Sequence, residues 1–455
     1  MGVSIQDPHQ LGGTAQPATD WWPSAPAPAT LQAEPAEDYP RRVEYTTDHV
    51  DLTVFKRGEP AISELTRTDE HSALLTHHPD FLLYDFGPHH PLRPERIVAG
   101  LDLLEASGLW LPDVETLAPN PASESDVESV HDPSYVKAVE EASTGDLPLD
   151  RLGAYGLTAT DNPAFPGMHH AATIIAGGSI EAVRRVMDGT IQHAFNPAGG
   201  WHHAHRARAS GFCVYNDPAM AAALAARDQG ARVAYLDFDC HHGDGVQWIF
   251  YRDPGVLTVS FHESGRFLFP GTGEVDEVGD GPGKGFSVNL PFAPFSRDRQ
   301  WIEAVDALVP ALVERYKPDI LITNHGCDTH AWDPQTHMNL TTVSLAHQAV
   351  LSHRLAHEYC GGRWIAVGSG GYDWRRVVPR SWAILWATMT GRLLPGNLPE
   401  RWLARWSDGA ESPMPRTFLD DDVLASGLPV QAGVERFNQE SLRAALSVTG
   451  LRHAS

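Results

Sequence analysis

Apolar and polar positions alternate along the chain in blocks of two lengths. Short runs that are apolar almost throughout end in Gly, His or Asp, and they occupy residues 193–200, 231–239, 255–263, 319–326 and 363–371. Longer stretches with helical spacing lie between them, for example 218–230 and 299–317. Strands that lack polar alternation and are separated by helices are typical of a parallel sheet buried on both faces. The pattern predicts an α/β fold with a central, mostly parallel sheet and helices on both faces.

The two ends of the chain differ from this pattern. Residues 1–40 contain seven prolines and lack the apolar periodicity that a packed core requires. We interpret residues 1–40 as a Pro/Ala-rich arm and residues 41–74 as an N-terminal extension. Residues 75–399 are the expected catalytic domain, and residues 400–455 are a C-terminal extension packed on it.

Composition narrows the classes of partner and compartment. The 34 basic and 58 acidic residues give a net charge of −24, which disfavours binding to nucleic acid or anionic membranes. The four cysteines form no CxxC pair, so neither a disulfide framework nor a thiolate zinc knuckle is indicated. No signal peptide and no run of about 18 apolar residues is visible. We expect a soluble, cytoplasmic protein, and the oligomeric state stays open.

The segment YLDFDCHHGDG, residues 235–245, places three aspartates and two histidines directly behind an apolar run. Side chains alternate along a strand, so Asp237, Asp239 and, if the extension continues, His241 project to one side. Asp328 follows another apolar run and is the best candidate for a third ligand. Asp239, His241 and Asp328 would bind a borderline divalent metal and leave one coordination position open. The alternative is a strand end with solvated charges.

Two glycine-rich segments add further polar groups. GGWHHA, residues 199–204, places His202 and His203 behind two glycines, and VGSGGYDW, residues 367–374, places Tyr372 behind two more. Glycine lets the backbone approach a ligand closely and adopt positive φ. Both segments follow predicted strands, so they are expected at the edge of the sheet where ligands bind in open α/β folds.

Five motifs occur in a fixed order: GGWHHA with ASGFC and YND, then DFDCHHGDGV, FPGTG, GCDTHAWDP and GSGGY. Together they closely resemble the motifs of the zinc-dependent histone deacetylase superfamily. GFCVYNDPA and FGPHHPLRPERI most resemble its bacterial acetoin-utilisation branch. The resemblance covers roughly residues 75–399 and implies a single arginase/deacetylase-like domain that hydrolyses acetylated amines.

The resemblance implies one Zn²⁺ per chain with the ligands Asp239, His241 and Asp328, which agrees with the spacing argument. It implies that His203 acts as general base and then general acid and is held by Asp244. Zinc lowers the pKa of bound water to about 7 and acts as a Lewis acid. A histidine paired with a carboxylate can take a proton from that water and return one to the leaving nitrogen.

Further roles are implied in the same way. His202, paired with Asp237, would be an electrostatic partner, and Tyr372 would bind the oxyanion. Phe212 and Phe269 would form the aromatic walls of a tunnel for the methylene stem of an acyl-lysine. The glycines assigned to substrate binding are Gly211, Gly370 and Gly371.

The resemblance also implies two sites for structural K⁺ or Na⁺ ions. The first would use Asp237, Asp239, His241, Ser260 and Phe261. The second would use Phe250, Asp253, Val256 and Phe286. Most of these ligands would be backbone carbonyls, so the side chains alone do not test them.

The chain departs from the family pattern at three places, one of which is the pair His325 and His330, two additional imidazoles beside Asp328 that would either shape the site or cap a strand end. Members that act on histones carry an aspartate two residues after the histidine that matches His131, where it binds the peptide backbone. Here Pro133 occupies that position and Asp132 lies one residue earlier, which puts that contact in doubt. Ser369 interrupts the usual run of glycines before the catalytic tyrosine.

Three functions compete at this point. The first is a zinc amidohydrolase acting on acetylated lysine side chains or on small acetylated amines, acetylpolyamines included. The second is an arginase-type ureohydrolase, which needs a second metal and a carboxylate beside Asp328, but Thr329 and His330 follow it. The third is an acyl-lysine-binding module without turnover, and the presence of Tyr372 and His203 argues against it.

Overall fold

The computed structural model describes residues 72–110, 115–158, 160–410, 412–421, 424, 427–428 and 431–451. The predicted arm over residues 1–40 lies outside the described residues, as do all but the last three residues of the predicted extension over 41–74. Across the described ranges, none of the helices combines the length and the apolar character needed to cross a membrane.

Eight strands form one sheet in the order β2-β1-β3-β8-β7-β4-β5-β6, and every neighbouring pair is parallel. The strands are β1 (Ala73–Thr76), β2 (Glu115–Leu117), β3 (His193–Asn196), β4 (Val233–Asp237), β5 (Val256–Glu263), β6 (Ser287–Phe292), β7 (Ile320–Asn324) and β8 (Trp364–Val367). All strand residues except those of β2 are buried. This burial explains why their sequences are apolar without alternation.

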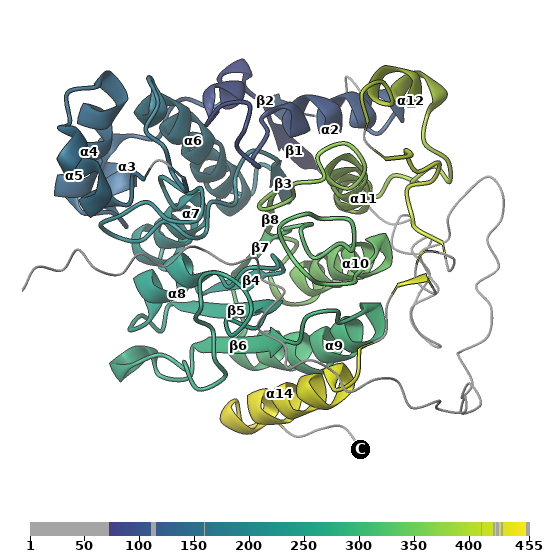
Figure 1. The fold of residues 1–455 in the computed structure, drawn as a ribbon. Coiled ribbons are helices and arrows are strands. Elements are labelled where there is room, and N and C mark those ends of the chain that lie inside the picture. Colours follow the sequence, from purple (N-terminus) through teal and green to yellow (C-terminus); the bar gives the residue numbers. More distant parts are fainter. Residues whose placement is uncertain are drawn as a thin grey trace, which may run out of the picture. The chain divides into compact units, whose positions relative to one another are not determined.

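Helices cover both faces of the sheet (Figure 1). One face carries α6, α7 and α8, and the other carries α9, α10 and α11. The α-helices are α2 (Glu95–Ala106), α3 (Glu124–Glu128), α4 (Pro133–Thr144), α5 (Leu149–Leu152), α6 (Met168–Met187), α7 (Asp217–Ala223), α8 (Asp244–Phe250), α9 (Asp298–Tyr316), α10 (Thr342–Tyr359), α11 (Val378–Thr390), α12 (Glu400–Trp406) and α14 (Val434–Val448). The shorter helical turns are η3 (Pro79–Leu83), η4 (Gly153–Tyr155), η5 (Leu224–Asp228) and η6 (Gly281–Gly283). The predicted α/β fold is confirmed.

The five apolar runs correspond to β3, β4, β5, β7 and β8, and the two helical stretches correspond to α7 with η5 and to α9. Four of these strands end together at one edge of the sheet. Asp237 pairs in register with Asn324, and Asn324 and Asn196 both pair with Val367. The loops that follow these four strands therefore emerge side by side. They carry the motifs GGWHHA, DFDCHHGDG, GCDTHAWDP and GSGGY.

The chain beyond residue 399 packs against the same core. The buried Trp402 of α12 donates a hydrogen bond from Nε1–H to the carbonyl of Ala99 in α2, at 3.0 Å. In α14, the side-chain oxygen of Asn438 accepts the backbone N–H of Ala293, which follows β6, at 2.9 Å. The exact domain limits stay a prediction.

Candidate metal centre

Asp239, His241 and Asp328 lie together and are all buried. One donor atom from each lies within 4.8 Å of the other two. The Nδ1 atom of His241 is 2.9 Å from Oδ2 of Asp328 and 3.2 Å from Oδ1 of Asp239. The structure thus brings together the three residues predicted as ligands. Two carboxylates and one imidazole are suitable ligands for a borderline divalent metal such as zinc.

A turn, and not strand alternation, makes Asp239 and His241 converge. Strand β4 ends at Asp237, so the extended conformation does not continue to His241 as the alternation argument required. The backbone N–H of Asp239 donates to Oδ1 of Asp237 at 3.2 Å, and the N–H of His241 donates to Oδ1 of Asp239 at 2.9 Å. These bonds fold the chain at the end of the strand and aim the two side chains at Asp328.

Further hydrogen bonds orient both carboxylates of the site. Oδ2 of Asp239 accepts hydrogen bonds from the Ser369 hydroxyl at 2.8 Å and the Gly370 N–H at 2.9 Å. Oδ1 of Asp328 accepts the N–H of Cys240 at 2.8 Å. A Cβ atom at Gly370 would lie 2.5 Å from Asp328 and 2.6 Å from Asp239, so glycine keeps this space open. The residues present fit a divalent metal.

Charge in the site favours a bound cation. Burial, together with the neighbouring Asp239 carboxylate, raises the pKa of Asp328 to about 6. Burial also works to lower the pKa of His241, but its hydrogen bonds to Asp239 and Asp328 outweigh burial and raise that pKa well above the ordinary value. Two buried carboxylates that share one imidazole need further positive charge, which a divalent ion would supply.

Two histidine–carboxylate pairs lie beside this set. Nδ1 of His202 is 2.7 Å from Asp237, and Nδ1 of His203 is 2.7 Å from Asp244. Burial opposes protonation of His202, but Asp237 and Asp239 outweigh it and raise the pKa of His202 to about 9. Burial and the charge on His202 lower the pKa of His203 to about 4. These opposite shifts favour the protonated form of His202 and the neutral form of His203, which can accept a proton.

Aromatic side chains border the histidines. The ring of Phe269 packs edge-on against His203 with 5.0 Å between centroids, and Phe212 packs in the same way against Tyr372 at 5.9 Å. A Cβ atom at Gly211 would lie 2.4 Å from the His203 ring, so only glycine fits there. Burial, with the nearby carboxylates, raises the pKa of Tyr372 well above its ordinary value, so its hydroxyl keeps its proton and can donate a hydrogen bond.

The motifs that converge on this site match a known family. The sequence profile of the histone deacetylase domain matches residues 90–389. The chain belongs to this histone deacetylase family. The deacetylase is 41% identical over 369 residues to the acetoin utilization protein AcuC of Bacillus subtilis (strain 168), which covers 81% of this chain and 95% of the relative. AcuC of Staphylococcus xylosus is 34% identical over 369 residues, covering 81% of this chain and 96% of the relative.

A third relative, AcuC of Staphylococcus aureus (strain MSSA476), is 36% identical over 340 residues, which is 74% of the deacetylase and 87% of that protein. The resemblance drawn from the five motifs is therefore confirmed at the level of the family. The roles of individual residues stay predictions, supported by the contacts described above.

Several buried residues position the site, although sequence reasoning did not single them out. The carboxylate of Asp333 accepts the backbone N–H of Tyr372 at 2.7 Å. Asp217 accepts the N–H groups of Gly200 and Trp201 at 3.0 and 2.9 Å, which fixes the loop before the histidine pair. Asp333 lies inside the motif HAWDP and Asp217 inside YNDPA, both of which were quoted for the family resemblance. Membership in these motifs was the only sequence signal for a role of either residue in the site.

Two more such residues act on the same loops of the deacetylase. The buried Arg96 guanidinium donates to the carbonyl of Ser369 at 2.6 Å. Asn324, the last residue of β7, donates from Nδ2–H to Oδ1 of Asp237 at 3.0 Å. The first belongs to the RPERI motif and the second to the apolar run before Asp328. The sequence alone did not indicate which residue Arg96 or Asn324 would contact.

Contacts connect some of the residues of the two predicted K⁺ or Na⁺ sites. In the first set, Asp237 pairs in register with Ser260 on the neighbouring strand. In the second, the Asp253 N–H donates to the Phe250 carbonyl at 2.9 Å, and the Phe286 carbonyl accepts the Thr258 N–H at 2.9 Å. Cation binding at both sets stays a prediction.

A surface pocket of about 550 Å³ opens beside Phe269 and Asp244 of the deacetylase. Two arginines, Arg206 and Arg208, are among the residues that line it. The carboxylate of Asp132 is 3.8 Å from Arg206. Asp132 lies one residue before the position at which histone-directed members carry their aspartate. Its carboxylate therefore lies beside Arg206 in the wall of this pocket.

Proposed function

We propose that this deacetylase is a zinc-dependent amidohydrolase that removes acetyl groups from lysine side chains of proteins. The convergence of Asp239, His241 and Asp328 beside the His203–Asp244 pair carries the proposal. The His203 and His241 rings are 5.8 Å apart, so a base and a metal ligand set share one site. The names of the relatives support a role in acetoin utilisation, and we place the reaction in the cytoplasm.

A zinc ion held by these three residues would lower the pKa of a water molecule and polarise the acetyl carbonyl. His203 accepts the proton of the attacking water at its Nε2 atom, because its Nδ1–H is directed at Asp244. The same imidazole then gives a proton to the nitrogen of the leaving amine. A positioned acid–base group of this kind contributes roughly 10²–10⁴-fold to the rate.

The other polar groups act on the charge that develops at the carbonyl oxygen. The Tyr372 hydroxyl donates a hydrogen bond to the oxyanion, and its raised pKa keeps it protonated for this purpose. The cationic His202 remains paired with Asp237 and adds positive charge beside the ligands. In this proposal His202 does not transfer a proton.

The surroundings of the site favour a protein substrate over a polyamine. Phe212 and Phe269 provide apolar walls suited to the methylene stem of an acetyl-lysine. The arginines of the neighbouring pocket, Arg206 and Arg208, repel a cationic polyamine and attract acidic side chains that flank the lysine. Acetylpolyamine hydrolysis is therefore the second candidate function. Nothing comparable favours a ureohydrolase, because His330 bonds Asp420 at 2.8 Å and does not join the ligand set.

The substrate class is tested with zinc-loaded protein and two substrates side by side. One is a peptide with acetyl-lysine between acidic residues, and the other is acetylputrescine. We expect acetate release from the peptide, with a higher kcat/KM for the peptide than for acetylputrescine. A clear preference for acetylputrescine would assign the deacetylase to small amines.

A further inference from the structure

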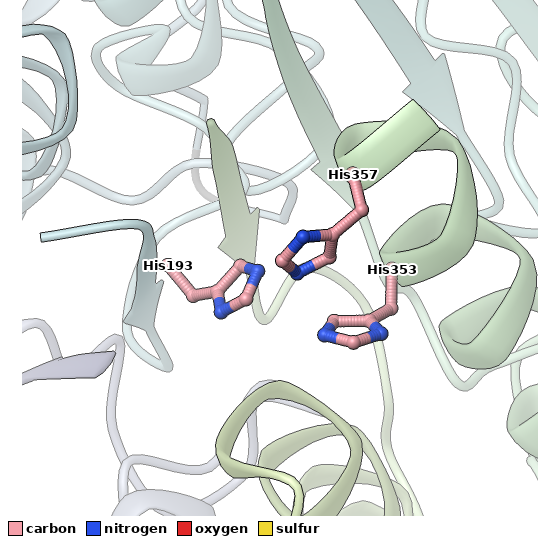
Figure 2. A group of neighbouring side chains, drawn as sticks. All are labelled: His193, His353 and His357. Carbon is pink, nitrogen blue, oxygen red and sulfur yellow. The ribbon is translucent and has the colours of Figure 1, made fainter. Parts of the chain in front are cut away.

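Three histidines form a cluster away from the candidate metal centre. His193 is the first residue of β3, and His353 and His357 are four residues apart on α10. Figure 2 shows their imidazole rings facing one another, one from the strand and two from the helix. Strand β3 ends at Asn196 beside the catalytic loops, so its first residue lies at the opposite edge of the sheet. The two sites are separate.

The three rings are arranged as ligands of one ion. One nitrogen from each lies within 4.8 Å of the other two. The ring centroids are 4.9, 5.1 and 4.5 Å apart. Ligand nitrogens about 2.0–2.1 Å from a tetrahedral zinc ion lie roughly 3.4 Å from each other. Small rotations of the side chains would therefore gather the three nitrogens around an ion.

The backbone around the cluster holds the histidines in place. His193 pairs in register with Trp364 of β8, and the Trp364 N–H donates to the Gln192 carbonyl at 3.0 Å. Residues four apart on a helix lie on one face, which sets His353 above His357. The turn after α10 is closed by the Gly362 N–H, which donates to Ala356 at 2.9 Å. Strand and helix thus hold the three histidines close to one another.

The composition and burial of the cluster select the ligand. Imidazole suits zinc, cobalt, nickel and copper, whereas calcium and magnesium need oxygen ligands. His193 and His353 are 0% and 4% exposed, and His357 is only half-buried and leaves a route from solvent. We propose that His193, His353 and His357 bind one divalent transition-metal ion of this group, which fastens α10 to β3. The proposal does not depend on the catalytic assignment.

The test is a Co²⁺ titration of the full-length protein, prepared without a histidine tag and freed of metal by chelation. Binding is followed by equilibrium dialysis and by the visible absorption of Co²⁺. The variants are His353→Gln and His357→Gln, and the matched control is His347→Gln on the same helix, whose side chain contacts Asp306 instead. Circular dichroism checks that each protein is folded, and the half-buried His357 provides a variant if His353→Gln does not fold.

We expect wild type and His347→Gln to bind one more equivalent of Co²⁺ per chain than either cluster variant. Saturation with Co²⁺ should raise the melting temperature of the wild type by about 3 °C or more beyond the increase seen in the cluster variants. The zinc-loaded cluster variants should retain acetate release. If the candidate catalytic site fails to bind metal, the wild type should bind one equivalent of Co²⁺ and the cluster variants none. The difference between these proteins therefore still tests the cluster. Equal stoichiometry in wild type and both cluster variants would overturn the proposal and leave three packed imidazoles.

Discussion

The backbone N–H of Tyr372 donates to the carboxylate of Asp333 at 2.7 Å, and this contact fixes the backbone of the tyrosine independently of its hydroxyl. Tyr372→Phe therefore removes the proposed oxyanion donor without freeing the loop. We expect kcat for acetate release to fall by about 10²–10³. Zinc content should stay unchanged by elemental analysis, and Tyr359→Phe, at the end of α10, serves as control. Unchanged turnover in Tyr372→Phe would refute the oxyanion assignment.

The two histidine–carboxylate pairs should differ in their contribution to catalysis. The pKa of His203 is lowered to about 4 and that of His202 is raised to about 9, so only His203 is available as a base at neutral pH. His203→Ala should lower kcat by roughly 10²–10⁴. His202→Ala removes only an electrostatic contribution, so its loss should be smaller. Steady-state kinetics of both variants at pH 7.5 check this order, and a larger loss in His202→Ala would reverse the assignment.

The pocket arginines should set the preference for charge around the acetyl-lysine. Arg208→Glu places negative charge where we expect acidic flanking residues to bind. KM for the acidic peptide should rise by about 10-fold at low salt, and the increase should shrink as ionic strength rises. Lys284→Glu makes the same charge change at an exposed position outside the pocket lining. Similar KM values in the two variants would mean that the pocket does not bind the peptide.

Asp420 should make the segment beyond residue 399 essential for stability. Its carboxylate is 2.7 Å from the buried Arg380 and 2.8 Å from His330, and it accepts the Thr342 N–H at 3.0 Å. Asp420→Asn leaves the Arg380 charge buried without its partner. The free energy of unfolding should fall by about 3–5 kcal/mol in urea at pH 7, with the exposed Asp408→Asn as control.

The same residue predicts a pH dependence. Burial would raise the pKa of Asp420, but His330 and Arg380 outweigh burial and lower it. A carboxyl group with a depressed folded pKa contributes stability above its unfolded pKa of about 3.9, and this contribution is lost as the pH falls below it. The difference between wild type and Asp420→Asn should therefore shrink between pH 5 and pH 3. A constant difference would exclude ionisation of Asp420 as its source.

The fold and the ligand set were predictable from the sequence because local signals carry them. Unbroken apolar runs indicate buried parallel strands, and Asp239, His241 and Asp328 belong to ordered motifs. The route by which Asp239 and His241 converge was not predictable. The end of β4 at Asp237 is set by hydrogen bonds between carboxylates and the backbone, which leave no periodic pattern.

Long-range partners were also hidden from the sequence. Arg96 reaches the carbonyl of Ser369 across 273 positions of the chain, and nothing in either residue type names the other. The histidine cluster has one local signal, the four-residue spacing of His353 and His357. Its third member, His193, joins only because β3 lies beside β8 in the sheet.

The most direct test of the catalytic proposal is acetate release from an acetyl-lysine peptide while Zn²⁺ is returned to chelated protein. We expect the metal-free wild type to be inactive and to regain turnover as Zn²⁺ is added, because zinc activates water and the carbonyl. Asp328→Asn should stay below about 1% of wild type at the same zinc concentration, with Asp408→Asn as control. Full turnover without metal, or wild-type turnover in zinc-saturated Asp328→Asn, would contradict the proposal.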